Sequence, residues 1–235
     1  MKNISIMDKK TYNLIENYML SCMEDSAHDR EHVYRVLFNA LEIAKTESGV
    51  DYDVLITACL LHDIGRKEQF ENPALCHAEV GAEKARRFLA EHHFDGEFIE
   101  KVARCILCHR FRNDRPPRAM EEKILFDADK LDVTGAVGIA RTLVYKGQVA
   151  EPLYRLDENG QVSNGEKDTQ ASFFREYKFK LENIYGRFYT RLGAELARKN
   201  RGAAVDFYQS LLGQVSGIYS AGREELARHV EDTAQ

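Results

Sequence analysis

A continuous apolar run that ends in two polar residues places the strongest constraint on what this chain can fold into. Residues 54–61 read VLITACLL, and the sequence continues directly with His62 and Asp63. Such a run is comfortable only in a protein core, so the two polar side chains emerge beside buried surface. A histidine and a carboxylate in that position must be hydrogen-bonded, paired with a charge or bound to a metal.

The composition fits one domain with a substantial core. The chain has 235 residues, of which 44% are hydrophobic, and its formal net charge is −5. This acidic balance gives no general attraction to nucleic acid or to an anionic membrane. No apolar run reaches the roughly 18 residues that span a bilayer, and the amino terminus lacks the apolar core of a signal peptide. We therefore expect a cytoplasmic protein with no nucleic-acid and no membrane partner.

Apolar residues recur mainly at steps of three and four, and this period predicts an all-α fold. Residues 1–150 are expected to form a helical core, with residues 151–235 adding an exposed loop or small hairpin and two long C-terminal helices that pack on it. The first of these helices, with apolar residues from Phe174 to Leu192, is expected to pack on the core or on a second subunit, which leaves a homodimer open. The helices predicted in the core cover residues 11–22, 28–46, 51–64, 72–92, 95–110 and 117–132.

The cysteines indicate reduced thiols in the core. The chain has five, an odd number, and most lie within apolar helical patterns rather than in a disulfide framework. Cys105 and Cys108 form one CxxC, which without a second CxxC is a weak signal for a zinc or redox site.

Several histidines and carboxylates fall on or beside apolar helical faces. His28 and His32 stand four residues apart on one helix face, and His32 adjoins the apolar stripe. Asp129 flanks another apolar line, where a half-buried carboxylate needs a cation. The full set is His32, His62, Asp63, His77, His109 and Asp129.

Two imidazoles and two carboxylates would make a shell of nitrogen and oxygen donors. Such a shell, from His32, His62, Asp63 and Asp129, favours Mn²⁺, Mg²⁺, Fe or Ni before structural Zn²⁺. Four protein ligands leave coordination positions open, and there a water can lose its proton near neutral pH and attack phosphorus.

Three short segments of the sequence resemble, in the same order along the chain, the motifs of the HD-domain superfamily of metal-dependent phosphohydrolases. They are HDREHVYRV from residue 28, LLHDIG from residue 60 and DADKLD from residue 127, and the resemblance covers about residues 27–135. The family likeness implies a helical bundle that holds one divalent ion, Mn²⁺ first, with Mg²⁺, Fe, Ni or Zn²⁺ as alternatives. It assigns the metal to His32, His62, Asp63 and Asp129.

Two further positions have family counterparts. His77 with Gly81 resembles the HPxxG element, and His109 resembles the second histidine of the HHE element in dinuclear relatives. The resemblance implies a second ion or a substrate phosphate here, with Arg110 and Lys130 as additional candidates. No GYP motif follows His109, which argues against the cyclic-di-GMP phosphodiesterase branch.

Basic and acidic residues after the HD pair are the candidates for catalysis. Nucleotidase and guanosine-polyphosphate hydrolase members carry a glutamate four residues after the HD histidine, where this chain has Arg66, and the nearest acid is Glu68. Glu68 is either within reach of a metal-bound water or a surface acid. Arg66 and Lys67 are expected to bind phosphate, so the predicted catalytic set is Asp63, Glu68, Arg66 and Lys67.

Three more features have two readings each. The arginines at 110, 112, 115 and 118 either bind phosphate or form a solvated basic loop. Lys130 is a phosphate ligand or a surface charge. Asp132 either orients a histidine ring from outside the ligand shell or is an ordinary carboxylate at a helix C-terminus, which the helix dipole disfavours.

The resemblance is greatest to the short bacterial HD hydrolases, which include Mn²⁺-dependent pyrophosphohydrolases. It implies an enzyme that converts (deoxy)nucleoside triphosphates to monophosphate and pyrophosphate. The alternatives are a 5'-nucleotidase or phosphodiesterase of the same fold, or a non-catalytic metal-binding module for sensing or dimerisation.

Overall fold

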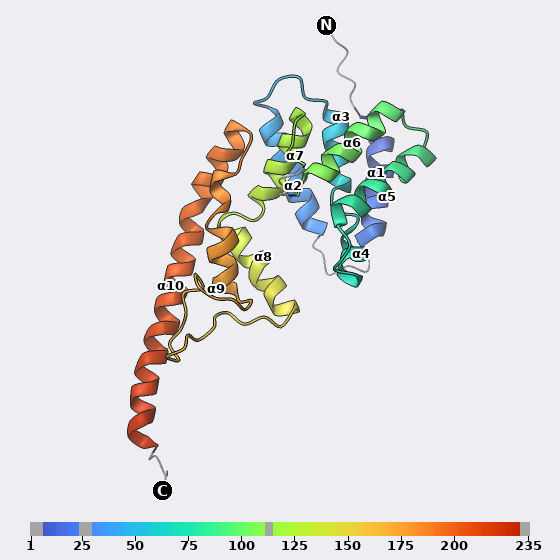
Figure 1. The fold of residues 1–235 in the computed structure, drawn as a ribbon. Coiled ribbons are helices and arrows are strands. Elements are labelled where there is room, and N and C mark those ends of the chain that lie inside the picture. The colour runs from blue at the N-terminus through green and yellow to red at the C-terminus, as the bar shows by residue number, and fades with distance from the viewer. Residues whose placement is uncertain (1–6, 24–29, 111–114, 231–235) are drawn as a thin grey trace. The chain divides into compact units, whose positions relative to one another are not determined.

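Helices dominate the chain, as the sequence predicts (Figure 1). The computed structural model describes residues 7–23, 30–110 and 115–230, so His28 and Arg112 lie outside the described residues. Within those ranges the regular elements are helical, apart from one isolated antiparallel bridge between Leu156 and Val162. No helix in the described part is both long and apolar enough to cross a membrane.

The chain divides into two compact units. The first comprises Met1–Asp132 with Phe188–Glu195, and the second comprises Val133–Arg187 with Leu196–Gln235. The division at residue 150 expected from the sequence stays a prediction about domains.

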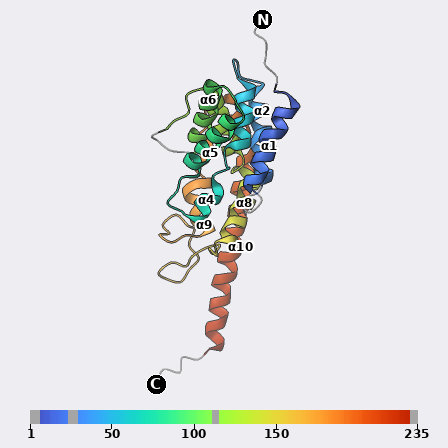
Figure 2. The same cartoon turned by 90° about the vertical axis from the view of Figure 1, so that its right-hand side faces the viewer.

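The first unit is a bundle with α3 at its centre. In Figures 1 and 2, α5 and α6 lie side by side, and α3 packs against α1, α2, α5, α6 and α7. The helices are α1 (Lys9–Met23), α2 (Arg30–Ala44), α3 (Tyr52–Leu61), α4 (Arg66–Glu71), α5 (His77–Glu91), α6 (Gly96–Cys108) and α7 (Met120–Leu131).

The apolar run of residues 54–61 forms the greater part of α3. Asp51 caps this helix by accepting a hydrogen bond from the backbone N–H of Val54 at 3.2 Å. Its side chains are buried almost all around the axis, as expected of a helix that lacks a polar face. The helix ends at Leu61, so the next two residues, His62 and Asp63, lie buried inside the bundle.

The predicted helix over residues 72–92 is wrong at its start, because α5 begins at His77. The Asn72 side chain accepts a hydrogen bond from the Ala74 backbone N–H at 3.2 Å, which forms a local turn instead of a helix cap. The short helix α4 precedes this turn and was not predicted.

The helix predicted to start at Pro117 also begins later, at Met120. The Glu122 carboxylate accepts a hydrogen bond from the Arg118 backbone N–H at 2.7 Å. It also forms an ion pair with Arg104, whose Nε lies 3.1 Å away. The side chain of Glu122, in the first turn of α7, thus binds the backbone just before the helix. This contact fixes the start of α7 at Met120 instead of at Pro117.

The second unit is built around an aromatic cluster. Tyr177 stacks on Tyr208 with ring centroids 3.9 Å apart, and Phe173 and Phe174 are fully buried beside them. The elements of this unit are α8 (Gly135–Gln148), α9 (Phe173–Glu176), a π-helical turn (Tyr177–Leu181), a 3₁₀ turn (Ile184–Gly186) and α10 (Arg191–His229) from Leu196 onward.

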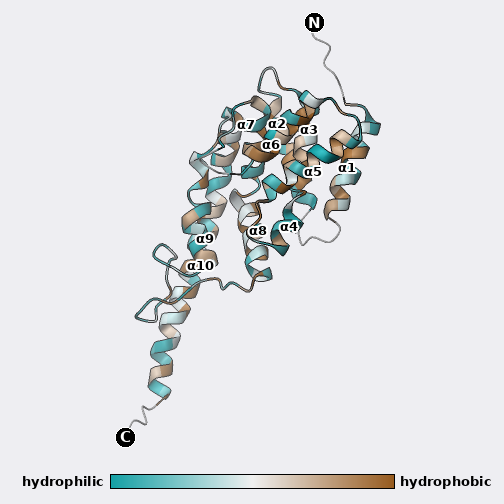
Figure 3. Cartoon of the chain, turned by 45° about the vertical axis from the view of Figure 1, so that its right-hand side comes forward, coloured by the Kyte–Doolittle hydropathy of each residue, from teal (hydrophilic) through white to brown (hydrophobic). Residues whose placement is uncertain are grey.

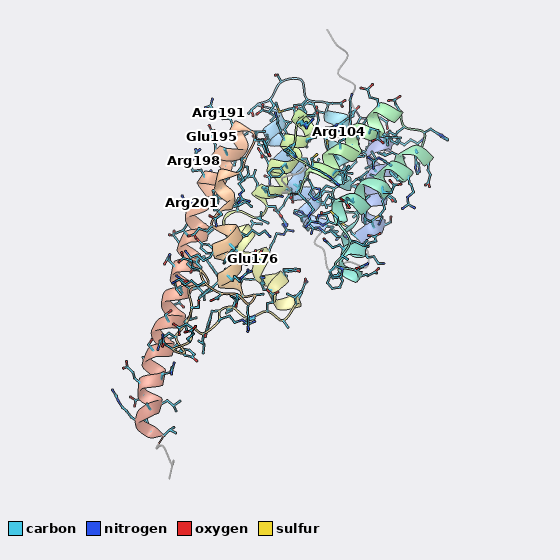
Figure 4. All side chains as sticks on the ribbon, viewed as in Figure 1. Arg104, Glu176, Arg191, Glu195, Arg198 and Arg201 are labelled. Carbon is cyan, nitrogen blue, oxygen red and sulfur yellow. The ribbon has the colours of Figure 1, made fainter. Side chains whose placement is uncertain are left out.

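The prediction of two long C-terminal helices is wrong for the first of them. The segment with the apolar stripe changes from α to π to 3₁₀ geometry and ends at Gly186, and a single 39-residue helix, α10, follows. Figure 4 labels Arg191, Glu195, Arg198 and Arg201 along this helix. Asp127 explains the new start, because its carboxylate accepts hydrogen bonds from the backbone N–H groups of Tyr189 and Thr190. Along α10 apolar and polar residues are interspersed (Figure 3).

Candidate metal centre

Two histidines that follow helix ends in the first unit are oriented by backbone carbonyls. His62 Nδ1 lies 2.7 Å from the Cys59 carbonyl oxygen, and His109 Nδ1 lies 2.6 Å from the Ile106 carbonyl oxygen. A carbonyl oxygen only accepts, so each Nδ1 carries the proton and donates it. In the neutral ring Nε2 is therefore left with a lone pair, as in histidines that bind metals.

Two further histidines are oriented by side chains. His32 Nδ1 lies 2.7 Å from Asp132 Oδ2, and His77 Nδ1 lies 2.6 Å from Gln69 Oε1. Asp132 thus lies within hydrogen-bond distance of His32, and its role in orienting the ring stays a prediction; Gln69 is not among the predicted residues. All four histidines consequently direct Nε2 away from these partners and toward the same buried region.

The Nε2 atoms of these histidines meet in pairs. His32 Nε2 and His62 Nε2 are 3.4 Å apart, and His77 Nε2 and His109 Nε2 are 3.2 Å apart. All four residues are buried. Two nitrogen lone pairs at such a separation need a cation between them, either a proton or a metal ion.

Asp63 lies between the two pairs of histidines. Its Oδ2 atom is 3.5 Å from His32 Nε2 and 3.6 Å from His62 Nε2. Its Oδ1 atom is 3.5 Å from His77 Nε2 and 3.6 Å from His109 Nε2. One carboxylate thus faces both pairs, with a different oxygen toward each.

The donor atoms form two clusters whose spacing fits divalent ions. His32, His62 and Asp129 form one cluster, and Asp63, His77 and His109 form the other, with the donors of each within 4.8 Å of one another. Two donors bound about 2.1–2.2 Å from one ion lie about 3.0–3.5 Å apart. The Nε2 and carboxylate distances in both clusters are close to that range.

Basic side chains accompany the carboxylates. Lys130 Nζ lies 2.6 Å from Asp129 Oδ2, while Asp129 Oδ1 lies 3.4 Å from His32 Nε2. Arg66 Nε lies 2.9 Å from Asp63 Oδ1. Lys130 and Arg66 thus each contact a carboxylate of the clusters, and their predicted roles toward phosphate stay predictions.

Arg35 is a residue of the site that sequence reasoning missed. Its Nε donates to Asp132 Oδ1 at 2.7 Å, and its second N–H group reaches Asp132 Oδ2 at 3.1 Å. Arg35 follows His32 by three residues on α2, so the helical period places both on one face. That spacing was the available signal for a link between Arg35, Asp132 and His32.

Burial and charge set the protonation of the clusters. Burial lowers the pKa of His62 to about 4 and that of His77 to about 2, so both rings are neutral at pH 7. Burial also lowers the pKa of His32, but hydrogen bonds to Asp129, Asp132 and Asp63 outweigh that effect and raise it to about 10. Despite their burial, Asp63 and Asp129 have pKa values well below the usual range because of Arg66 and Lys130.

The turn after the HD pair packs against α5 without space for a side chain. A Cβ atom at Gly65 would lie 2.3 Å from the His77 carbonyl oxygen and 2.6 Å from the Gly81 backbone nitrogen. The backbones of Gly65 and Gly81 therefore approach each other directly. This contact places His77, the first residue of α5, beside Asp63.

The remaining candidates have partners outside the two clusters. Glu68 Oε1 pairs with Lys84 Nζ at 2.7 Å, and its Oε2 atom is buried without a hydrogen-bond partner. Arg110 donates to the Cys76 sulfur at 3.4 Å. Arg115 pairs with Glu79 at 2.9 Å, and Lys67 is half-buried on α4.

The cysteines are free thiols, as predicted. Cys59, Cys105 and Cys108 are buried, and Cys22 and Cys76 are half-buried. No ligand cluster within the described ranges contains Cys105 or Cys108, so the CxxC adds nothing to the centre.

Comparison with known proteins gives one family and one relative by sequence. A family model described as the HD domain matches residues 30–134, the part of the chain that contains both clusters. The uncharacterized protein YpgQ of Bacillus subtilis is 29% identical over 195 residues, which make up 83% of this chain and 88% of YpgQ.

Solved structures resemble the chain over most of its length. A predicted HD superfamily hydrolase from an uncultured Thermotogales bacterium is 30% identical with a TM-score of 0.57, over 86% of this chain and 91% of that protein. The crystal structure of Bacillus subtilis YpgQ in complex with ADP is 26% identical with a TM-score of 0.67, over 88% of this chain and 99% of YpgQ.

Proposed function

This chain belongs to the HD-domain superfamily and has the fold of its hydrolases, and from that premise we propose that it is a divalent-metal-dependent phosphohydrolase acting on a small nucleotide. The observation that carries the proposal is the position of Asp63, whose two oxygens each face a different pair of histidine Nε2 atoms. Donors of nitrogen and oxygen alone favour Mn²⁺, Mg²⁺, Fe or Ni, and we propose Mn²⁺ as the working ion.

The two clusters would hold two ions. His32, His62, Asp129 and Oδ2 of Asp63 would hold the first, and His77, His109 and Oδ1 of Asp63 would hold the second. A divalent ion in this position supplies a water of lowered pKa as the nucleophile and a positive charge beside the phosphoryl oxygens.

The protein's own groups would fix the donors and receive the phosphates. Asp132, Gln69 and two backbone carbonyls hold the four imidazole rings in the orientation that directs Nε2 inward. Lys130 donates to Asp129 and to the His109 carbonyl oxygen, which leaves its third N–H for a phosphoryl oxygen. Arg66 and Arg110 are half-buried basic groups beside the same clusters, suited to anionic oxygens.

We propose pyrophosphohydrolysis of (deoxy)nucleoside triphosphates as the reaction. Water would add to the α-phosphorus, the bond from that phosphorus to the oxygen bridging it to the β-phosphate would break, and pyrophosphate would leave with a nucleoside monophosphate as the other product. A nucleotide substrate is supported by the similarity to YpgQ, whose structure was solved in complex with ADP.

A substrate panel tests the proposal. The purified chain is incubated with Mn²⁺ and nucleoside mono-, di- and triphosphates and cyclic nucleotides, and released phosphate and pyrophosphate are measured separately. We expect pyrophosphate from triphosphates, absent in Asp63→Asn. Glu100→Gln removes an exposed carboxylate that pairs with the Arg86 side chain, and it is the matched control with full activity.

The other outcomes each overturn the proposed reaction in a defined way. Phosphate from monophosphates alone would make the chain a 5'-nucleotidase, and opening of cyclic nucleotides would make it a phosphodiesterase. Silence across the panel, together with a melting temperature that chelation lowers strongly, would make the ions structural in a non-catalytic module.

A further inference from the structure

The two clusters differ in the number of donors they offer. The first cluster has four donor atoms: Oδ2 of Asp63, Oδ1 of Asp129 and the Nε2 atoms of His32 and His62. The second cluster has three donor atoms: Oδ1 of Asp63 and the Nε2 atoms of His77 and His109. The second cluster also contains a single carboxylate oxygen, so it offers less negative charge to an ion.

A guanidinium already shares that single oxygen. Arg66 Nε donates to Asp63 Oδ1 at 2.9 Å, the same atom that faces His77 and His109. The Asp63 side chain is 3% exposed and that of Arg66 is 30% exposed, so solvent screens this ion pair little. The positive charge of Arg66 would repel a divalent ion bound to Oδ1, because the two charges would be close together in a largely buried environment.

The basic residue of the first cluster has a different geometry. Lys130 contacts Oδ2 of Asp129 and leaves Oδ1, the oxygen that faces His32, to an ion. Lys130 therefore leaves Oδ1 of Asp129 as the oxygen that can bind an ion in the first cluster. Arg66, in contrast, already donates a hydrogen bond to Oδ1 of Asp63, the carboxylate oxygen of the second cluster.

We infer that the two clusters bind divalent ions with unequal affinity, and that Arg66 is the positioning residue that keeps the cluster of Asp63, His77 and His109 the weaker one. This inference rests on the proposed function, because it assumes the metal centre proposed there. It makes the second ion the one that responds to the ion concentration, while the first stays bound.

Mn²⁺ titration of the full-length chain tests the inference without any substrate. Free Mn²⁺ is counted by its electron paramagnetic resonance signal, and calorimetry gives the two affinities. We expect the wild type to bind the second ion at least tenfold more weakly than the first. Arg66→Met should tighten the second step at least tenfold and leave the first within a factor of about three, whereas Arg66→Lys, which restores a positive charge, should return the second step toward the wild-type value.

Arg86→Met is the matched control, since Arg86 makes the same Nε contact of 2.9 Å to a carboxylate, Glu100, at the surface. It should change neither step. A merely structural role for Arg66 would weaken both steps or lower the melting temperature, and it would not tighten one step selectively.

Equal affinities in the wild type, or a second step that Arg66→Met leaves unchanged or weakens, would overturn the inference. Binding of no Mn²⁺ at all would overturn both the inference and the proposed metal centre. Two unequal steps that respond to Arg66→Met in a protein that hydrolyses no nucleotide would uphold the inference and count against the proposed reaction alone.

Discussion

Asp132 Oδ2 lies 2.7 Å from His32 Nδ1, and this hydrogen bond directs the other ring nitrogen of His32 toward Asp63 and Asp129. Asp132→Asn keeps the shape but removes the charge that orients the ring. We expect the first ion to bind about 10–100-fold more weakly, the usual effect of losing such a partner. Calorimetric Mn²⁺ titration measures this, and unchanged affinity would mean that the hydrogen bond does not orient a ligand.

Asp63 and Asp129 should differ in how many ions they control. Asp63→Asn removes a donor from both clusters, so we expect both ions to be lost, whereas Asp129→Asn affects only the first cluster. Both variants should abolish hydrolysis. Metal content after dialysis against Mn²⁺, measured by mass spectrometry with circular dichroism to verify the fold, separates the two. Retention of both ions in Asp63→Asn would remove Asp63 from its bridging position.

The stability of the metal-free protein should fall on both sides of neutrality. The folded pKa values of His62 and His77 are lowered by burial to about 4 and about 2, from an ordinary 6.5. As the pH falls from 6.5 toward 4, the unfolded chain binds protons that the folded chain does not, so the free energy of unfolding decreases.

His32 acts in the opposite direction, because its carboxylate partners raise its folded pKa to about 10 against the burial that lowers it. Its stabilisation is complete below pH 6.5 and is lost as the pH rises toward 10. Urea unfolding in EDTA between pH 4.5 and 9.5 checks both limits. His62→Gln should reduce the loss of stability in acid, with His77 accounting for what remains, and a stability independent of pH would contradict the assigned protonation states.

Two neighbouring glycines should respond differently to alanine. Gly65→Ala would place a Cβ atom 2.3 Å from the His77 carbonyl oxygen, and backbone must move to admit it. We expect a loss of about 1–3 kcal/mol, typical of overpacking, and weaker binding at the His77 cluster. Gly81→Ala meets its nearest atom at 3.5 Å and lies in a helix interior, so it should be neutral or stabilising. Equal melting temperatures for the two variants would contradict this packing.

Asp127 should be essential for the start of α10. It is fully buried and accepts three hydrogen bonds, from the backbone N–H groups of Tyr189 and Thr190 and from the Thr190 hydroxyl. Asp127→Ala leaves these donors unpaired and should cost about 2–3 kcal/mol in the free energy of unfolding. Asp206→Ala, an exposed carboxylate later on the same helix, is the control and should change it by less than about 0.5 kcal/mol. Denaturant unfolding measures both.

The proposed metal ligands were accessible to sequence reasoning because they are tied to strong local patterns. His62 and Asp63 follow a run that could only be core, and His32 adjoins an apolar stripe on α2. Arg35 shared only a helix face with His32, and Gln69 had no local pattern at all, because the contacts of both residues depend on which helices meet. Arg35 reaches Asp132 across 97 positions of the chain, and no local pattern specifies that approach.

The wrong helix boundaries have a common cause in competing local and tertiary hydrogen bonds. Asn72 followed by proline is typical of a helix start, but the Asn72 side chain binds Ala74 and makes a turn. The helical period from Phe174 to Leu192 is genuine in sequence, yet Asp127 binds the backbone at Tyr189 and Thr190 and requires a new helix to begin there. A carboxylate more than 60 positions away decides that boundary.

Anomalous diffraction from crystals grown with Mn²⁺ tests the central claim most directly, because it locates the ions without reference to any substrate. We predict two peaks on opposite sides of Asp63, the stronger one in contact with His32, His62 and Asp129 and the weaker one in contact with His77 and His109. A protein that binds Mn²⁺ elsewhere, or that shows no peak in contact with Asp63, would contradict the metal centre and the function proposed from it.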